Sequence, residues 1–294
     1  MAMQLDHATK KIEAAPSGQT PMAGWDTSSH EDFFKYYEQQ SLSPQTMARF
    51  RSTCAALLRQ LPADSVRRPL DVLDVGCGAG AQSQFWLDAG HRYWGIDINL
   101  PLIELARQRA KRMSLTASFD VGTATALPYA DQSMDICLLP ELLEHVADWQ
   151  SCIDEAIRVL RPGGLLYLST TNKLCPRQEE FNLPLYGWYP QVLKRYFERR
   201  ALTDWPAVAN HAKYPAVNWF SFFGLRNYLS PRGFVCLDRF DMIDPGTKGK
   251  VARGIIAAIR SVPPLRWLGH VATDYTELVA RRVPGRVLQV PTRA

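Results

Sequence analysis

The spacing of apolar and polar positions changes near Leu70. From there, short apolar runs of strand length alternate with longer stretches of helical spacing, of which Leu100–Met113 and Trp149–Leu160 are the clearest. This alternation is typical of strands joined by crossover helices, so we predict an α/β fold, a doubly wound, Rossmann-like parallel sheet between helices. The runs that predict its first five strands are Leu70–Val75, Tyr93–Ile98, Ala117–Val121, Met134–Leu139 and Leu165–Thr170.

The flanking segments have different patterns. Residues 1–30 are rich in Ser, Thr, Pro and Gly, and an aromatic-rich segment from Glu31 and a second helix beginning near Pro44 follow. Two later runs, Phe234–Ile243 and Tyr275–Arg281, complete a sheet of seven strands. We therefore divide the chain into a leader with a first helix (1–45), a core (46–172), an aromatic and Pro-rich lid or substrate insertion (173–230) and the last two strands with a basic segment between them (231–294).

Composition narrows the class of protein without naming a function. The net charge is +5 and 46% of the residues are hydrophobic, which suits a globular core. The sequence has no apolar run of about 20 residues and no apolar signal at its N-terminus. Its six cysteines lack C-x-x-C spacing, so buried reduced thiols are expected. These features favour a cytoplasmic protein, and the modest charge does not demand a nucleic-acid partner.

A glycine-rich turn follows the first predicted strand. It reads Asp74-Val75-Gly76-Cys77-Gly78-Ala79-Gly80, and glycines there let the backbone approach a ligand that a Cβ would exclude. Asp97, followed by Ile98, ends the second predicted strand about 20 residues later, where a carboxylate can accept hydrogen bonds from both hydroxyls of a ribose. The two features together predict a nucleoside-containing cofactor and leave NAD open as an alternative.

The motifs that come later favour one family. Gly122-Thr123-Ala124-Thr125-Ala126-Leu127-Pro128 and Leu160-Arg161-Pro162-Gly163-Gly164 resemble the later motifs of class I methyltransferases. In that family the first stretch usually reads G-D-A-x-x-L-P and its aspartate binds the adenine amino group; here Thr123 takes that place and the Ala124 backbone remains. The resemblance covers about residues 70–171 and implies S-adenosylmethionine as cofactor. The residues it implies for cofactor binding are Asp74, Gly76, Gly78, Gly80, Asp97, Ile98, Thr123, Ala124 and Leu139.

The motif E-x-x-E-H follows the fourth predicted strand. On a helix, Glu141, Glu144 and His145 would share one face. The stretch from Glu141 to Asn172 is similar to that of the ubiquinone-biosynthesis O-methyltransferases, and small-RNA 2′-O-methyltransferases carry a similar motif; both groups associate it with a divalent metal. Two interpretations stay open: the triad binds Mg²⁺ and lowers the pKa of an acceptor hydroxyl, or Glu144 and His145 act on the proton directly or pack.

The C-terminal third of the chain bears on the acceptor. The run Phe181–Pro190 offers aromatic walls for a small apolar molecule, or is an ordinary hydrophobic lid. Residues 249–268 form a basic, Ile-rich segment that either lies in a membrane interface or packs on the lid. We expect methylation of a hydroxyl on a small lipophilic or phenolic molecule. The alternatives are C- or N-methylation without metal and RNA 2′-O-methylation; the oligomeric state stays open.

Overall fold

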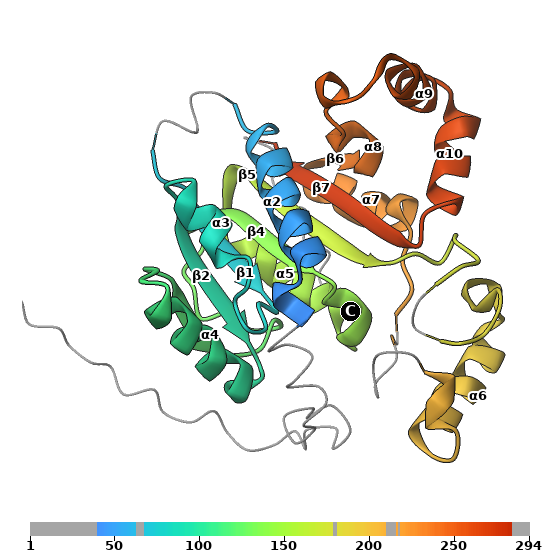
Figure 1. Cartoon of the computed structure of the whole chain (residues 1–294), viewed down its shortest axis with the longest axis horizontal. Coiled ribbons are helices and arrows are strands. Elements are labelled where there is room, and N and C mark those ends of the chain that lie inside the picture. The colour runs from blue at the N-terminus through green and yellow to red at the C-terminus, as the bar shows by residue number, and fades with distance from the viewer. Residues whose placement is uncertain (1–39, 63–67, 179–180, 210–215, 217, 284–294) are drawn as a thin grey trace, which may run out of the picture.

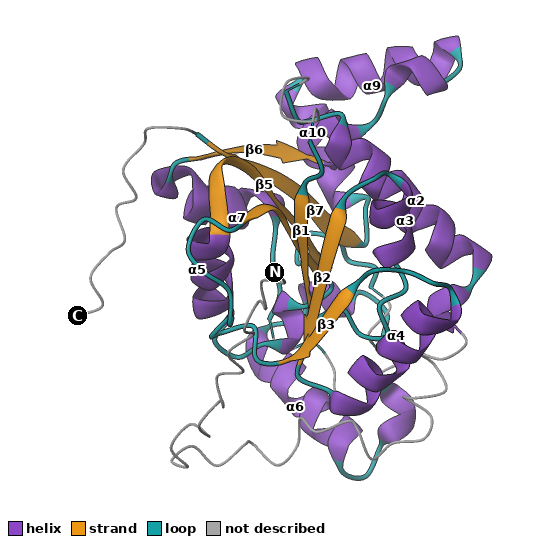
Figure 2. Cartoon of the chain, turned by 90° about the vertical axis from the view of Figure 1, so that its left-hand side faces the viewer, coloured by secondary structure: helices purple, strands orange, loops and turns teal. Residues whose placement is uncertain are grey.

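The structure is a computed structural model that describes residues 40–62, 68–178, 181–209, 216 and 218–283 of the 294-residue chain (Figure 1). A seven-stranded sheet in the order β3-β2-β1-β4-β5-β7-β6 runs through it, and Figure 2 shows helices on both faces of this sheet. The predicted fold class is therefore confirmed. The strands are β1 (Asp71–Val75), β2 (Arg92–Asp97), β3 (Ser118–Val121), β4 (Met134–Pro140), β5 (Leu160–Thr171), β6 (Phe234–Asp238) and β7 (Tyr275–Arg282).

The sheet is mixed rather than wholly parallel. Strands β1 to β5 pair in parallel, whereas β7 lies antiparallel between β5 and β6. The prediction of a parallel sheet was wrong for β7, because alternation of polar and apolar positions is the same in both strand directions and does not reveal which one is used.

The helices begin where the sequence supplies caps. Ser43 accepts a hydrogen bond from the Thr46 backbone N–H at the start of the Pro44 helix, and Asn99 does the same for Leu102 N–H. The α-helices are α2 (Pro44–Leu58), α3 (Ser83–Asp88), α4 (Leu100–Arg112), α5 (Trp149–Val159), α6 (Gln191–Leu202), α7 (Phe222–Leu229), α8 (Arg239–Met242), α9 (Lys250–Ser261) and α10 (Pro263–Val271). Short 3₁₀ helices are η2 (Gln40–Leu42), η4 (Leu143–His145), η5 (Tyr186–Trp188), η6 (Pro206–Val208), η7 (Ser230–Arg232) and η8 (Pro245–Thr247).

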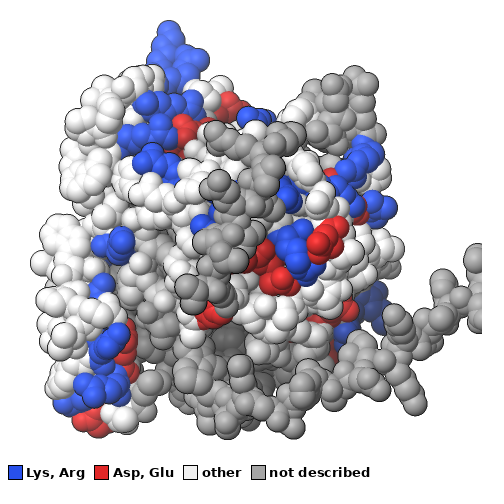
Figure 3. All heavy atoms as spheres, turned by 180° about the vertical axis from the view of Figure 1, so that it is seen from behind, with Lys and Arg blue, Asp and Glu red and all other residues white. Residues whose placement is uncertain are grey.

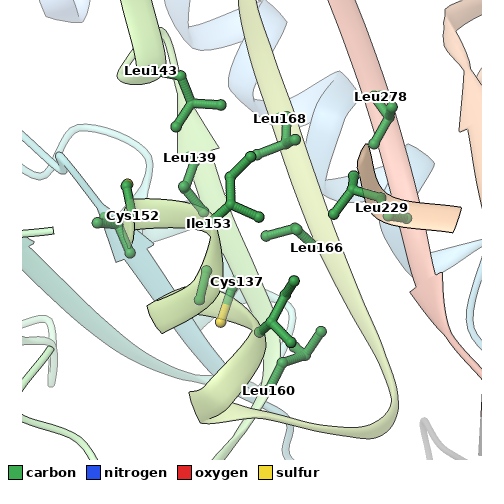
Figure 4. Packing of buried hydrophobic residues seen from close by; sticks show 14 of the residues in the cluster. Cys137, Leu139, Leu143, Cys152, Ile153, Leu160, Leu166, Leu168, Leu229 and Leu278 are labelled. Atoms are coloured by element: carbon green, nitrogen blue, oxygen red, sulfur yellow. The ribbon is translucent and has the colours of Figure 1, made fainter. Parts of the chain in front are cut away.

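Two apolar clusters hold the helices on the sheet. Leu166 and Leu168 of β5 belong to the cluster that joins β4, β5 and β7 to α5 and α7 (Figure 4). Leu165 and Tyr167 belong to the cluster under α2, α3 and α4 on the opposite face. The side chains of successive β5 residues therefore pack on opposite faces of the sheet, as the pleat of a strand requires.

Three predicted segments differ in extent from the structure. The last part of 173–230 is not an insertion: Phe220, Phe222 and Leu229 pack in the main core, while Phe181 and Tyr186 form a separate aromatic cluster. The sixth strand ends at Asp238 instead of Ile243, because a capping box at Asp238 starts α8. The leader and the helix expected from Glu31 lie outside the described residues.

The expectation of buried thiols holds for four of the six cysteines. All six cysteines are free; four are buried and Cys77 and Cys236 are half-buried.

Candidate active site

The glycine-rich turn lies where the order of strands reverses. Strand β1 has β2 on one side and β4 on the other, and ligands of such sheets usually bind beyond the carboxyl ends of the strands at this point. Gly76, Gly78 and Gly80 all have positive φ, from 52° to 76°. A Cβ on Gly80 would stand 2.6 Å from the Phe119 ring. The turn therefore needs its glycines for backbone shape and for packing.

Asp97 fixes this turn from the end of β2. One carboxylate oxygen accepts the Gly78 N–H and the other accepts the Asn99 N–H, both at 2.9 Å. Each oxygen keeps a lone pair, so the carboxylate can still accept hydrogen bonds from ribose hydroxyls. Burial raises the pKa of Asp97, although the backbone N–H groups oppose that shift.

Asp74 is fully buried at the end of β1. Its Oδ2 accepts hydrogen bonds from Gln82 Nε2, at 2.7 Å, and from the Tyr93 hydroxyl. Its Oδ1 has no hydrogen-bond partner among the described residues. Burial raises the pKa of Asp74 to about 7. An unpartnered buried carboxylate oxygen suits a cationic group of a ligand, which would stabilise the ionised form.

The structure gathers most of the other implied cofactor residues near Asp97. The Gly122 N–H donates to the Asp97 carbonyl at 3.0 Å, which brings Thr123 and Ala124 beside the end of β2. Ile98 is 75% exposed there. The Thr123 hydroxyl lies 2.9 Å from that of Thr125 and is also exposed.

Leu139 is the exception among the implied cofactor residues. Its side chain is fully buried in the core between β4 and α5 (Figure 4). Only its backbone is therefore placed for contact with a ligand at the strand ends.

The E-x-x-E-H residues do not share a helical face, so that prediction was wrong. Glu141 has a positive φ of 50°, and only Leu143–His145 forms a short 3₁₀ helix. Glu141 pairs with Arg49 of α2, while buried Glu144 accepts a hydrogen bond from the Thr170 hydroxyl at 2.7 Å.

The two carboxylates also lie on opposite sides of β5. Glu141 lines a pocket together with Ser169, whereas Glu144 bonds to Thr170, the next residue, whose side chain points to the other face. Within the described ranges, no three His, Cys, Asp or Glu side chains are grouped to hold a metal. The residues present thus do not fit the triad Mg²⁺ site. Burial lowers the pKa of His145, which favours its neutral form.

A pocket lies under α2 at the carboxyl edge of β4 and β5. The Tyr167 hydroxyl donates to Glu277 across the β5–β7 pair at 3.0 Å, and Gln82 links the pocket to Asp74. The pocket is lined by Arg49, Phe50, Thr53, Gln82, Pro140, Glu141, Tyr167, Ser169, Tyr275 and Glu277.

The sequence prediction missed most of these pocket residues. Their signal was polar alternation in two strands: Tyr167 and Ser169 in β5, Tyr275 and Glu277 in β7. The predicted aromatic run does not line this pocket, since Phe181 and Tyr186 stack on each other in the separate cluster, with ring centroids 4.3 Å apart.

Comparison with known proteins assigns the domain. Residues 73–168 match a family model described as a methyltransferase domain. This part of the chain is a class I methyltransferase domain. A putative sarcosine dimethylglycine methyltransferase from Galdieria sulphuraria has the same fold, with TM-score 0.51 and 15% identity over 81% of this chain and 87% of that chain.

Curated relatives match over part of their length. An uncharacterized methyltransferase of Mycolicibacterium gilvum is 43% identical over 45% of this chain and 51% of its own. A probable chloroplastic tocopherol O-methyltransferase of Oryza sativa is 28% identical over 64% of this chain and 53% of its own. A ubiquinone biosynthesis O-methyltransferase of a Chelativorans strain is 31% identical over 47% and 55%. This chain spans about half the length of these relatives.

One structural finding bears on membranes. Among the helices within the described ranges, none has both the length and the apolar character needed to cross a bilayer.

Proposed function

We propose that this protein transfers the methyl group of S-adenosylmethionine to a hydroxyl of a small lipophilic or phenolic molecule. The observation that carries the proposal is the small pocket under α2, which is lined by Tyr167 and Glu277 and is joined through Gln82 to Asp74 at the turn of the methyltransferase domain. Two of the relatives above are named as O-methyltransferases of tocopherol and of ubiquinone biosynthesis. These names support a hydroxyl acceptor of lipophilic character.

The described residues fit the cofactor. Asp97 offers two acceptor oxygens for the ribose, and Asp74 offers a buried, unpartnered oxygen for the ammonium group of the methionine part. When bound, S-adenosylmethionine supplies an electrophilic methyl group on a sulfonium. The Gly76–Gly80 turn lets the backbone lie close to the ligand.

Glu277 is the proton acceptor in this proposal. A phenolic hydroxyl is a poor nucleophile until it loses its proton. As the new oxygen–carbon bond forms and the sulfur–methyl bond breaks, the hydroxyl proton passes to the Glu277 carboxylate. Tyr167 donates to Glu277 and thereby orients this carboxylate. Arg49, held by Glu141, covers the pocket from α2.

No metal enters this proposal, because Glu141 and Glu144 serve opposite faces of β5. Titration with Mg²⁺ by calorimetry, on protein saturated with S-adenosylhomocysteine, is expected to give no stoichiometric binding. Stoichiometric binding that is lost in both Glu144→Ala and His145→Ala would restore the metal triad.

The decisive experiment combines a binding and a transfer assay. We expect S-adenosylhomocysteine to bind, and radiolabelled methyl to pass to members of a panel of catechols and prenylated phenols. Glu277→Gln should lower kcat about 100-fold or more, and Tyr167→Phe about tenfold, with cofactor binding unchanged. Glu104→Gln, an exposed change on α4, is the control.

The outcomes separate the parts of the proposal. Absence of cofactor binding would overturn the methyltransferase function. Full activity of Glu277→Gln would overturn only the role of Glu277. Transfer to amine or carbon acceptors, and none to hydroxyls, would move the assignment to N- or C-methylation.

A further inference from the structure

The hairpin of α9 and α10 stands away from the sheet at one end of the molecule (Figures 1 and 2). One face of the hairpin packs inward, where Ile256 and His270 are buried. The hairpin also exposes six large apolar side chains. These exposed residues are Val251, Ile255, Val262, Leu265, Trp267 and Leu268.

Both helices of the hairpin contribute exposed apolar side chains. Val251 and Ile255 are 79% and 56% exposed and lie one helical turn apart, so they share a face of α9. Trp267 and Leu268 on α10 are 49% and 53% exposed. A Trp with an apolar body and a polar N–H suits the boundary between hydrocarbon and water.

The charged side chains of the α9–α10 segment itself have one sign. Between Asp244 and Asp274 the chain has no acidic residue. Lys248, Lys250 and Arg253 are exposed at the start of α9. Figure 3 shows Lys and Arg gathered at the upper left of the face seen from behind, the end of the molecule that holds α9 and α10.

The other two arginines of the segment have internal partners. Arg260 donates to the carbonyls of Phe240 and Ile243, and Arg266 pairs with Asp238 and Asp241. Arg260 and Arg266 therefore hold the hairpin to the body, while Lys248, Lys250 and Arg253 have no ion-pair partner among the described residues.

We propose that the α9–α10 hairpin docks the protein on an anionic phospholipid surface. The partner is identified by its chemistry. Exposed apolar side chains that include Trp267 suit the boundary between lipid headgroups and acyl chains, and the exposed Lys248, Lys250 and Arg253 suit anionic headgroups. The hairpin lies in the plane of the membrane and does not cross it. This proposal rests on the surface alone and holds whether or not the proposed methyl transfer is correct.

The test is sedimentation of the full chain with vesicles of phosphatidylcholine, with and without phosphatidylglycerol. Wild type should bind the anionic vesicles more tightly, and binding should weaken with salt. Lys250→Gln with Arg253→Gln should reduce binding about 25-fold, since each basic residue contributes about fivefold. Ile255→Asp should reduce it about tenfold or more, because it removes an apolar contact and adds a charge that the anionic headgroups repel.

Matched controls keep the result specific. Lys111→Gln with Arg112→Gln removes two exposed charges from α4, and Val192→Asp changes an apolar residue of α6 that is 82% exposed. Both should bind as wild type. Equal loss in these controls, or equal binding to neutral vesicles, would overturn the proposal. So would a dimer in sedimentation analysis that Ile255→Asp dissociates, because a second copy would then cover the face.

Discussion

The turn after β1 and the region where β6 meets α10 each enclose a fully buried aspartate, and the two differ in their surroundings. Asp74 accepts hydrogen bonds only from the neutral groups of Gln82 and Tyr93, and one oxygen has no partner among the described residues. Asp238 accepts from Arg266 and lies 2.9 Å from His270 Nε2. Burial alone would raise the pKa of Asp238, but these hydrogen bonds lower it to about 2.

This difference distinguishes an aspartate that stabilises the fold from one that is placed to bind a ligand. Asp238 has its counter-charges within the chain, so it acts as the anchor of α10. Asp74 has no counter-charge among the described residues, so its pKa stays high until a cationic ligand arrives. A buried carboxylate that lacks a cation is therefore a better marker of a binding site than burial by itself.

The largest effect is expected at the anchor. Asp238→Ala removes the acceptor that Arg266 and His270 share and leaves Arg266 paired with Asp241 alone, so it should lower the free energy of unfolding by about 3–5 kcal/mol. Urea unfolding followed by circular dichroism measures it. Asp131→Ala, which removes an exposed partner of Arg158, should cost about 1 kcal/mol or less. Equal costs would show that Asp238 is no anchor.

The next effect depends on pH. The folded pKa of Asp74 lies above its unfolded value of 3.8, so the folded state binds the extra proton between about pH 4 and 7. Stability of the ligand-free protein should thus fall as pH rises through that window. The stability of wild type relative to Asp74→Asn should fall by on the order of 2–4 kcal/mol between pH 4 and pH 8. A constant difference would mean that Asp74 has an ordinary pKa.

Asp238 should show the opposite sign. Its folded pKa lies below the unfolded value, so its contribution is present above about pH 4 and is lost as pH falls toward 2. The stability of wild type relative to Asp238→Ala should accordingly shrink on acidification.

The smallest expected effect concerns binding at Asp74. Asp74→Asn keeps an acceptor for Gln82 and Tyr93 but removes the negative charge, so the affinity for S-adenosylhomocysteine should fall about tenfold to 100-fold. Calorimetry measures this loss, and at pH 8 the variant should be no less stable than wild type. Asp88→Asn, exposed at the end of α3, should change neither quantity.

Local signals in the sequence determined where the strands, one helix start and the glycine-rich turn lie along the chain. The apolar runs located the seven strands, Pro44 marked the start of a helix, and the glycines with Asp97 marked the turn at the sheet edge. Each of these depends on a residue and its near neighbours, since hydrophobic periodicity, caps and positive φ act within a few positions.

The tertiary structure decided the rest. Glu141, Glu144 and His145 would share a face only on an α-helix, and the positive φ of Glu141 prevents that helix. Tyr167 and Glu277 meet because β7 turns antiparallel to β5, a pairing of residues 110 positions apart. Strand direction and pairing depend on how distant segments bury their surfaces together, and no local pattern encodes them.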